Sequence, residues 1–182
     1  MRFLKLITLI FFFTTIFVGC IKKGDNDPLI SIYKRSTRLA GVWKLKELQI
    51  QDHDVDQNGK INILIRTLTN DKYTETRGTD TLSKTYVGTL NTTLTITDSS
   101  SSNYSFKEEV ATNGLNYTNS LNNKTWSWKD GSKKSALVLQ DFKTFDILGL
   151  WSDKLELTIT DINALNVYGA HSYVEHWVFV KL

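Results

Sequence analysis

Oxygen-bearing side chains alternate along one short stretch of the chain, from Asp54 to Ile61. Asp54, Asp56 and Asn58 stand at every second position, and Gly59 supplies the sharp turn that follows. Calcium takes six to eight oxygen ligands, and this spacing directs three side chains toward one ion. The candidate calcium ligands are Asp54, Asp56, Asn58 and Lys60.

The same stretch resembles the first eight positions of an EF-hand loop, and this resemblance implies calcium. The twelfth position is Ile65, where an EF-hand carries a bidentate glutamate, and the flanking segments alternate like strands. The alternative is a hairpin turn in which Asp and Asn side chains bond to nearby backbone groups. We expect the hairpin turn, with calcium binding absent or in the millimolar range.

Three histidines, His53, His171 and His176, are the other candidate metal ligands. The segment from His171 to His176 lacks the spacing of helical zinc motifs. On a regular strand these two histidines point to opposite faces, so one ion cannot bind both. We expect them to be hydrogen-bonded or solvated.

Nucleophilic and phosphate-binding motifs are missing from the sequence. There is no Gly-x-Ser-x-Gly turn and no phosphate-cradling glycine loop. A carboxylate pair for glycoside hydrolysis remains open, because any fold can assemble one. We therefore expect a non-catalytic protein and no cofactor other than the calcium considered above.

The N-terminus has the features of a secretion signal. Arg2 and Lys5 precede an uncharged run from Leu6 to Val18, which is thirteen residues long. A membrane-spanning helix needs about 20 apolar residues, so this run is short for a permanent span. A true membrane anchor is the alternative. The segment 1–19 is expected to be a lipoprotein signal peptide.

The run ends in Phe17-Val18-Gly19-Cys20, which resembles the bacterial lipobox. The resemblance implies cleavage before Cys20, acylation of its thiol with fatty acids such as palmitate, and anchoring in the cell envelope, at the outer membrane. Cys20 is the only cysteine, so the domain has no disulfide and depends on its core. Removal of Arg2 and Lys5 leaves 20 basic and 19 acidic residues, too balanced a charge for nucleic-acid binding.

Residues 20–35 are polar, contain the only proline, and are expected to form a flexible tether. Residues 36–182 are expected to form one all-β domain of eight to ten antiparallel strands after a helical turn at 36–40. Apolar and polar residues alternate in its strands, most clearly from Thr85 to Thr97. The alternation leaves a β-barrel and a β-sandwich open. The residues that we expect inside are Trp43, Tyr86, Leu90, Leu94, Ile96, Phe106, Trp126, Trp128, Leu155, Leu157 and Ile159.

Two stretches and the ending of the chain favour the barrel. The segment 39–45, with Gly41 and Trp43, resembles the Gly-x-Trp opening of lipocalins, in which the tryptophan plugs the closed end. The segment 145–157 and the ending Trp177-Val178-Phe179 resemble lipocalin-like lipoproteins of Bacteroidota. The lipocalin arginine that stacks on the tryptophan has no counterpart, since only Val180, Lys181 and Leu182 follow. The resemblance implies a lipocalin-like β-barrel, with Gly41 and Trp43 in structural roles.

Two function classes follow from these features, with an enzyme or calcium-binding protein as a third. The first is a membrane-anchored module that binds a small apolar molecule or a glycan. The second is a structural or interaction subunit that docks onto another envelope protein. An interior cavity favours the first class, and a solid core with an exposed apolar patch favours the second.

Overall fold

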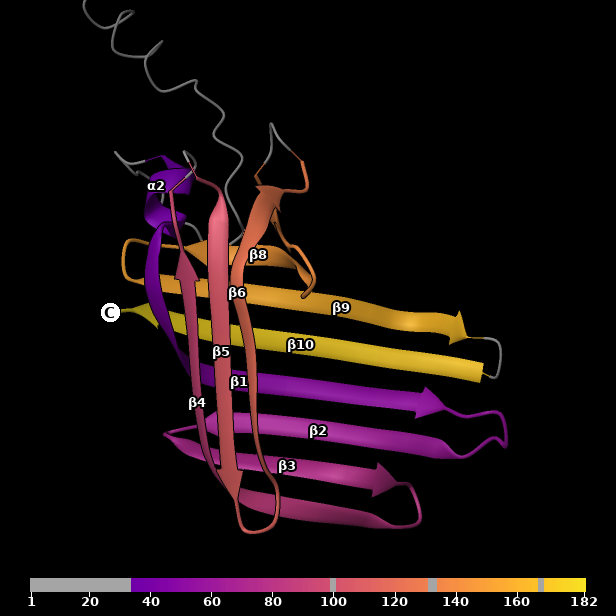
Figure 1. Ribbon diagram of the computed structural model, residues 1–182. Coiled ribbons are helices and arrows are strands. Elements are labelled where there is room, and N and C mark those ends of the chain that lie inside the picture. Colours follow the sequence, from indigo (N-terminus) through magenta and orange to yellow (C-terminus); the bar gives the residue numbers. More distant parts are fainter. Residues whose placement is uncertain (1–33, 99–100, 131–133, 167–168) are drawn as a thin grey trace, which may run out of the picture.

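The computed structural model describes residues 34–98, 101–130, 134–166 and 169–182, and no side chains between 161 and 171. The signal 1–19, Cys20 and the tether up to residue 33 lie outside the described residues. The described chain opens with a short helix, α2 (Arg35–Leu39), which matches the expected helical turn to within one residue. Ten strands follow it (Figure 1).

The strands are β1 (Gly41–Val55), β2 (Ile61–Thr69), β3 (Lys72–Thr79), β4 (Ser83–Ile96), β5 (Asn103–Thr112), β6 (Asn116–Trp128), β7 (Ala136–Leu139), β8 (Thr144–Leu150), β9 (Lys154–Asn166) and β10 (Gly169–Lys181). All neighbours are antiparallel, and β10 pairs with β1 to close the ring. The first part of β1 also pairs with the end of β4. The expected all-β class and strand number are confirmed.

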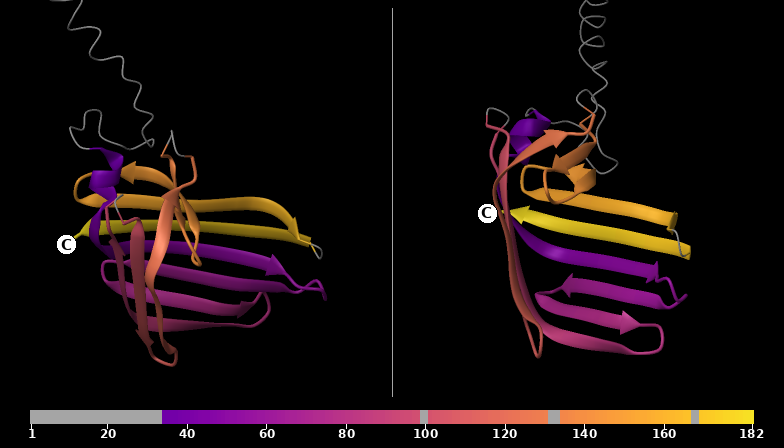
Figure 2. Two further views of the ribbon diagram at one scale, coloured as in Figure 1. Left: turned by 45° about the horizontal axis from the view of Figure 1, so that its top comes forward. Right: turned by 45° about the vertical axis from the view of Figure 1, so that its right-hand side comes forward.

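The ring is folded into two layers that cross at a steep angle (Figures 1 and 2). The long layer contains β9, β10, β1, β2, β3 and the first part of β4. The crossing layer contains the rest of β4, β5 and β6, while β7 and β8 lead back to β9. Because the ring is closed yet layered, the descriptions as a barrel and as a sandwich both fit.

The long layer extends well beyond the crossing layer, toward the β1–β2 hairpin (Figure 2). We call the side of the long layer that faces the crossing layer its inner face. Near the crossing this face packs into the core. Farther along the same strands no described strand lies over it, so inner-face side chains there meet solvent.

Gly88 stands where β4 passes from one layer to the other. Its neighbours are Tyr73 on β3 and Thr112 on β5. A Cβ atom at this position would lie 2.0 Å from the carbonyl oxygen of Ala111. The close approach of the strands at this corner therefore requires glycine.

The core lies between the layers and follows the expected alternation. On β5, Tyr104, Phe106, Glu108 and Val110 are buried, and the residues between them are more exposed. Eight of the eleven expected core residues are buried: Trp43, Leu90, Leu94, Ile96, Phe106, Trp126, Leu155 and Leu157. Tyr86, Trp128 and Ile159 are half-buried; Trp128 and Ile159 still pack against the core, so the expectation was wrong for Tyr86 alone.

Candidate functional site

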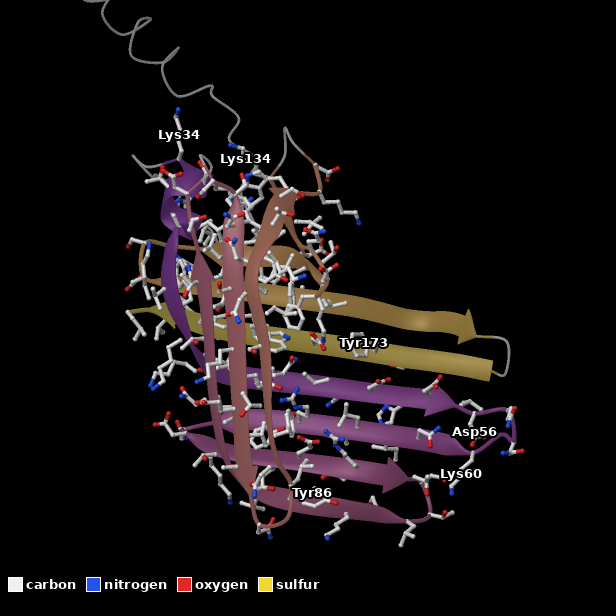
Figure 3. The ribbon with its side chains drawn as sticks, in the orientation of Figure 1. Lys34, Asp56, Lys60, Tyr86, Lys134 and Tyr173 are labelled. Carbon is white, nitrogen blue, oxygen red and sulfur yellow. The ribbon has the colours of Figure 1, made fainter. Side chains whose placement is uncertain are left out.

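The aspartate-rich loop forms the tip of the β1–β2 hairpin, far from the crossing layer, as the labels of Asp56 and Lys60 show in Figure 3. The Oδ1 atom of Asp56 accepts hydrogen bonds from the backbone N–H groups of Asn58, at 2.8 Å, and Lys60, at 3.0 Å. These bonds lower the pKa of Asp56. Gly59 has a φ of 74°, in the left-handed region that glycine tolerates.

This geometry is the hairpin turn that the sequence favoured for Asp54, Asp56, Asn58 and Lys60. Asp56 directs an oxygen at its own backbone, as in an Asx turn. Among the described residues, no group of three His, Cys, Asp or Glu side chains is placed to hold a metal ion. The affinity of the loop for calcium remains a prediction.

His53 and His176 are half-buried on the outer face of the long layer, on neighbouring strands. The side chain of His171 is outside the described set. The register of β9 and β10 is irregular between His171 and Ser172, so simple alternation does not extend through this point. The expectation that His171 and His176 face opposite sides therefore stays a prediction.

Gly41 and Trp43 lie at the start of β1, beside the chain's C-terminus. The Trp43 ring is fully buried, and its Nε1 donates a hydrogen bond to the carbonyl oxygen of Leu39 at 2.8 Å. The Nζ of Lys181 lies 5.0 Å from the ring centroid and donates to the carbonyl oxygen of Arg38. The chain lacks the arginine that lipocalins stack on this tryptophan, and Lys181 supplies a cation at the ring instead.

The most unusual feature of the interior is the presence of two groups of buried charged side chains. We call the first group the Glu75 cluster. It bridges β2 and β3 of the long layer to β5 and β6 of the crossing layer. Its members are Arg66, Tyr73, Glu75, Arg77, Glu108 and Tyr117.

Glu75 is fully buried at the centre of this cluster. Its carboxylate accepts hydrogen bonds from the hydroxyl of Tyr73 and the Nε of Arg77, and the hydroxyl of Tyr117 lies 3.4 Å away. The Nε of Arg66 is 3.6 Å from the same carboxylate. Arg77, whose side chain is 49% exposed, also places its guanidinium 5.9 Å from the ring centroid of Tyr117 on β6.

Arg66 links Glu75 to a second buried acid, Glu108. The Nη2 of Arg66 lies 2.9 Å from the Oε2 of Glu108, and both side chains are nearly buried. Burial lowers the pKa of Arg66, but Glu108 and the adjacent tyrosines outweigh burial and raise the pKa above its ordinary value. Burial also raises the pKa of Tyr73, which keeps its hydroxyl protonated as a donor.

The second group, the Glu175 cluster, lies on β10 and the β7–β8 turn. It contains Phe142, Lys143, Tyr173, Glu175 and Trp177. The fully buried carboxylate of Glu175 accepts from Lys143 Nζ and the Tyr173 hydroxyl, and from Trp177 Nε1 at 2.8 Å. Burial, together with Glu175, raises the pKa of Tyr173.

Both clusters stand at the border between the packed core and the uncovered inner face. Figure 3 shows Tyr173 on β10 and Tyr86 on β4, beside the β5–β6 turn. Tyr86 is the cross-strand neighbour of Glu75, and the exposed Lys84 neighbours Arg77. Carboxylates, cations and protonated tyrosines held in fixed positions can bind a polar molecule by hydrogen bonds and ring contacts.

Sequence reasoning missed these clusters, although the sequence contains a signal for them. Glu75, Glu108 and Glu175 each occupy a position on the apolar side of their own strand's alternation, two residues from a large aromatic residue. A charged residue is rarely buried without a partner. Three such positions on three strands would have predicted a charged site within the core.

No helix in the described ranges is long and apolar enough to span a membrane. Cys20, the expected lipidation site, lies outside those ranges. Comparison of the chain with protein-family models, curated proteins and solved structures finds no match.

Proposed function

We propose that this chain is a lipoprotein of the cell envelope, anchored in the outer membrane through Cys20, whose β-domain is a non-catalytic binding module for a small glycan. The anchor rests on the charged start, the short apolar run and the Gly19-Cys20 junction. The binding activity rests on the two charged clusters at the border of the uncovered inner face.

The observation that carries the proposal is the burial of three carboxylates and a nearly buried arginine in a core that apolar residues could fill. Moving charges out of water is costly, and replacing a buried ion pair by apolar residues is often neutral or stabilising. Stability alone therefore does not explain Glu75, Glu108, Glu175 and Arg66. The pKa values of Arg66, Tyr73 and Tyr173 beside these acids are raised, and groups with shifted pKa values are concentrated at binding and catalytic sites.

The same contacts favour a polar ligand over an apolar one. Trp177 packs against Phe106, Phe142, Phe145 and Phe179, with ring centroids 5.9 to 6.4 Å apart. Aromatic rings thus occupy the space between the layers where an apolar ligand would bind. On the same face of β3 and β4, Arg77 and Lys84 are exposed and Tyr86 is half-buried, and their hydrogen-bonding groups and ring face suit the hydroxyls and C–H faces of a sugar.

The test is direct binding of glycans to the purified mature domain. Mass spectrometry of small molecules that co-purify from envelopes selects the panel, and calorimetry measures affinity. Arg77→Ala should weaken binding about tenfold or more, as loss of a charged hydrogen bond does. Lys72→Ala is the matched control, because it removes one positive charge from the exposed outer side of the same strand.

Equal affinities of the Arg77→Ala and Lys72→Ala variants would contradict binding on the inner face. Failure of every envelope glycan to bind with a Kd below about 1 mM would contradict the module itself. For the anchor, intact-mass analysis should find acyl chains on Cys20. Membrane attachment of a cleaved Cys20→Ala protein would refute it.

The outer face of β2 favours a second candidate, a subunit that docks onto another envelope protein. Ile61, Ile63 and Ile65 share this face, and Ile61 is 37% exposed. Apolar residues there are typical of a covered strand. If this candidate is correct, Ile63→Lys should abolish co-purification of a partner protein without changing glycan binding.

A further inference from the structure

The ammonium group of Lys143 is surrounded by aromatic rings. Its Nζ lies 5.5 Å from the ring centroid of Tyr173, 5.6 Å from that of Phe142 and 5.8 Å from that of Trp177. The Phe142 and Trp177 rings are nearly perpendicular, at 85°. We call these three rings and the carboxylate of Glu175 the ammonium cage.

The cage has the chemistry of a recognition site for organic cations. Ring faces attract a cation within about 6 Å, and aromatic cages recognise ammonium groups of ligands in this way. The fourth side is Glu175, which is fully buried and accepts hydrogen bonds from Lys143 and Tyr173. Trp177 Nε1 holds the other carboxylate oxygen at 2.8 Å, so the negative charge has a fixed position.

Lys143 enters this cage from a turn and can leave it without a change of fold. The residue lies between β7 and β8, and its backbone is fixed by the hydrogen bond from Leu139 N to Lys143 O at 2.9 Å. Its side chain is 26% exposed, so solvent reaches it. Lysine has a flexible four-carbon stem, and rotation about that stem moves the ammonium into water while the turn stays in place.

We propose that the ammonium cage is the subsite for a free amine of the ligand, and that Lys143 occupies it until a ligand displaces it. The inference rests on the proposed glycan binding and makes the ligand an amino sugar with an unacetylated amine. The ammonium of the sugar would take the position of Lys143 Nζ against Glu175. Its hydroxyls would then face the uncovered part of the inner face.

A tethered competitor weakens the apparent affinity of the ligand that replaces it. A group on a short flexible link competes at an effective concentration of about millimolar. The apparent affinity of the ligand is then its intrinsic affinity multiplied by the fraction of sites that the tethered group leaves empty. Lys143→Ala empties the cage and leaves Glu175 with no ammonium. We therefore expect this variant to bind an amine about tenfold or more tightly than the wild type.

The experiment titrates the mature domain with glucosamine, N-acetylglucosamine and methylammonium, and follows Trp fluorescence and heat. Lys143→Ala should bind glucosamine and methylammonium more tightly than the wild type and gain nothing for N-acetylglucosamine. Lys124→Ala is the matched control, because Lys124 pairs with Asp141 of the same turn at 2.7 Å but contacts no cage ring. It should leave all three affinities unchanged.

Two further variants locate the gain in the cage. In the Lys143→Ala background, Glu175→Gln removes the charge and Tyr173→Leu removes one ring, and each should cancel the gain. Thermal unfolding identifies a variant that does not fold. Because Tyr173 is half-buried, its variant supplies the answer if the Glu175 variant fails to fold.

The outcomes separate the two proposals. A folded Lys143→Ala domain that binds neither amine up to about 10 mM, or binds them as weakly as the wild type, overturns the cage. If the cage is overturned in this way but the wild type binds neutral glycans, the proposed glycan binding is retained and only the cage is rejected. If no glycan binds but methylammonium binds to Lys143→Ala, the cage stands and the glycan proposal fails.

Discussion

Replacement of Arg66 by methionine tests whether the Glu75 cluster is an interdependent set of buried charges. Arg66 is 11% exposed in its side chain and is the cation placed 2.9 Å from Glu108, which is 6% exposed. Methionine keeps most of the stem volume and removes the charge. Breaking a buried ion pair from one side costs about 3–5 kcal/mol, because the remaining charge has neither water nor a partner.

Urea unfolding followed by Trp fluorescence measures this cost at pH 7. Lys107→Met is the control, since Lys107 pairs with Glu109 on the exposed side of the same strand as Glu108, at 2.6 Å. An exposed pair contributes at most about 1 kcal/mol. Adding Glu108→Gln to Arg66→Met should restore a large part of the stability, because no uncompensated charge then remains at that position.

A cost below about 1 kcal/mol at pH 7, or a cost equal to that of Lys107→Met, would refute the interpretation of Arg66.

Three other predictions follow from the described contacts. Trp126→Ala should cost about 3–5 kcal/mol in urea unfolding, because the ring is buried; under 1 kcal/mol would contradict its core position. Burial, with Asp141, raises the pKa of Tyr104 from 10.0 to about 12. The contribution of this shift to the free energy of unfolding should be complete below pH 10 and should fall as pH rises through about 12. The Tyr104→Phe variant should not show this fall. Calorimetry should find calcium binding absent or millimolar, and micromolar binding lost in Asp56→Ala would overturn the hairpin interpretation.

Alternation of side chains predicted the strands well because it is a local property. On β5, Phe106 is buried as the pattern predicts, and Tyr104 and Val110, which share its face, are buried with it. The Asn58-Gly59 turn also lies between strands as expected. Each of these features depends on a few neighbouring residues, so a single sequence contains the information.

The crossing of the layers could not be predicted from the local alternation of side chains. β4 pairs with β3 up to Gly88 and with β5 beyond it, and nothing in the alternation from Thr85 to Thr97 marks the change. Tyr86 lies two residues before this corner, where its half-buried ring sits beside Gly114 of the β5–β6 turn. Which strands meet at a corner is decided by the whole ring rather than by local pattern.

The charged clusters were missed for a different reason. The alternation was read as apolar against polar, so Glu108 was passed over between Phe106 and Val110, although it faces the core. Its partner Arg66 comes from β2, some forty residues earlier in the chain. A pattern shows that a buried charge needs a partner, but only the fold shows which partner it has.

Closure of the ring has a consequence for the order of folding. Residue 43 pairs with residue 181, so the first strand completes its hydrogen bonds only with the last one. Such distant pairings slow folding, because the entropy cost of closing a long loop precedes the contacts that offset it. The domain cannot close its ring while the C-terminus is still being synthesised.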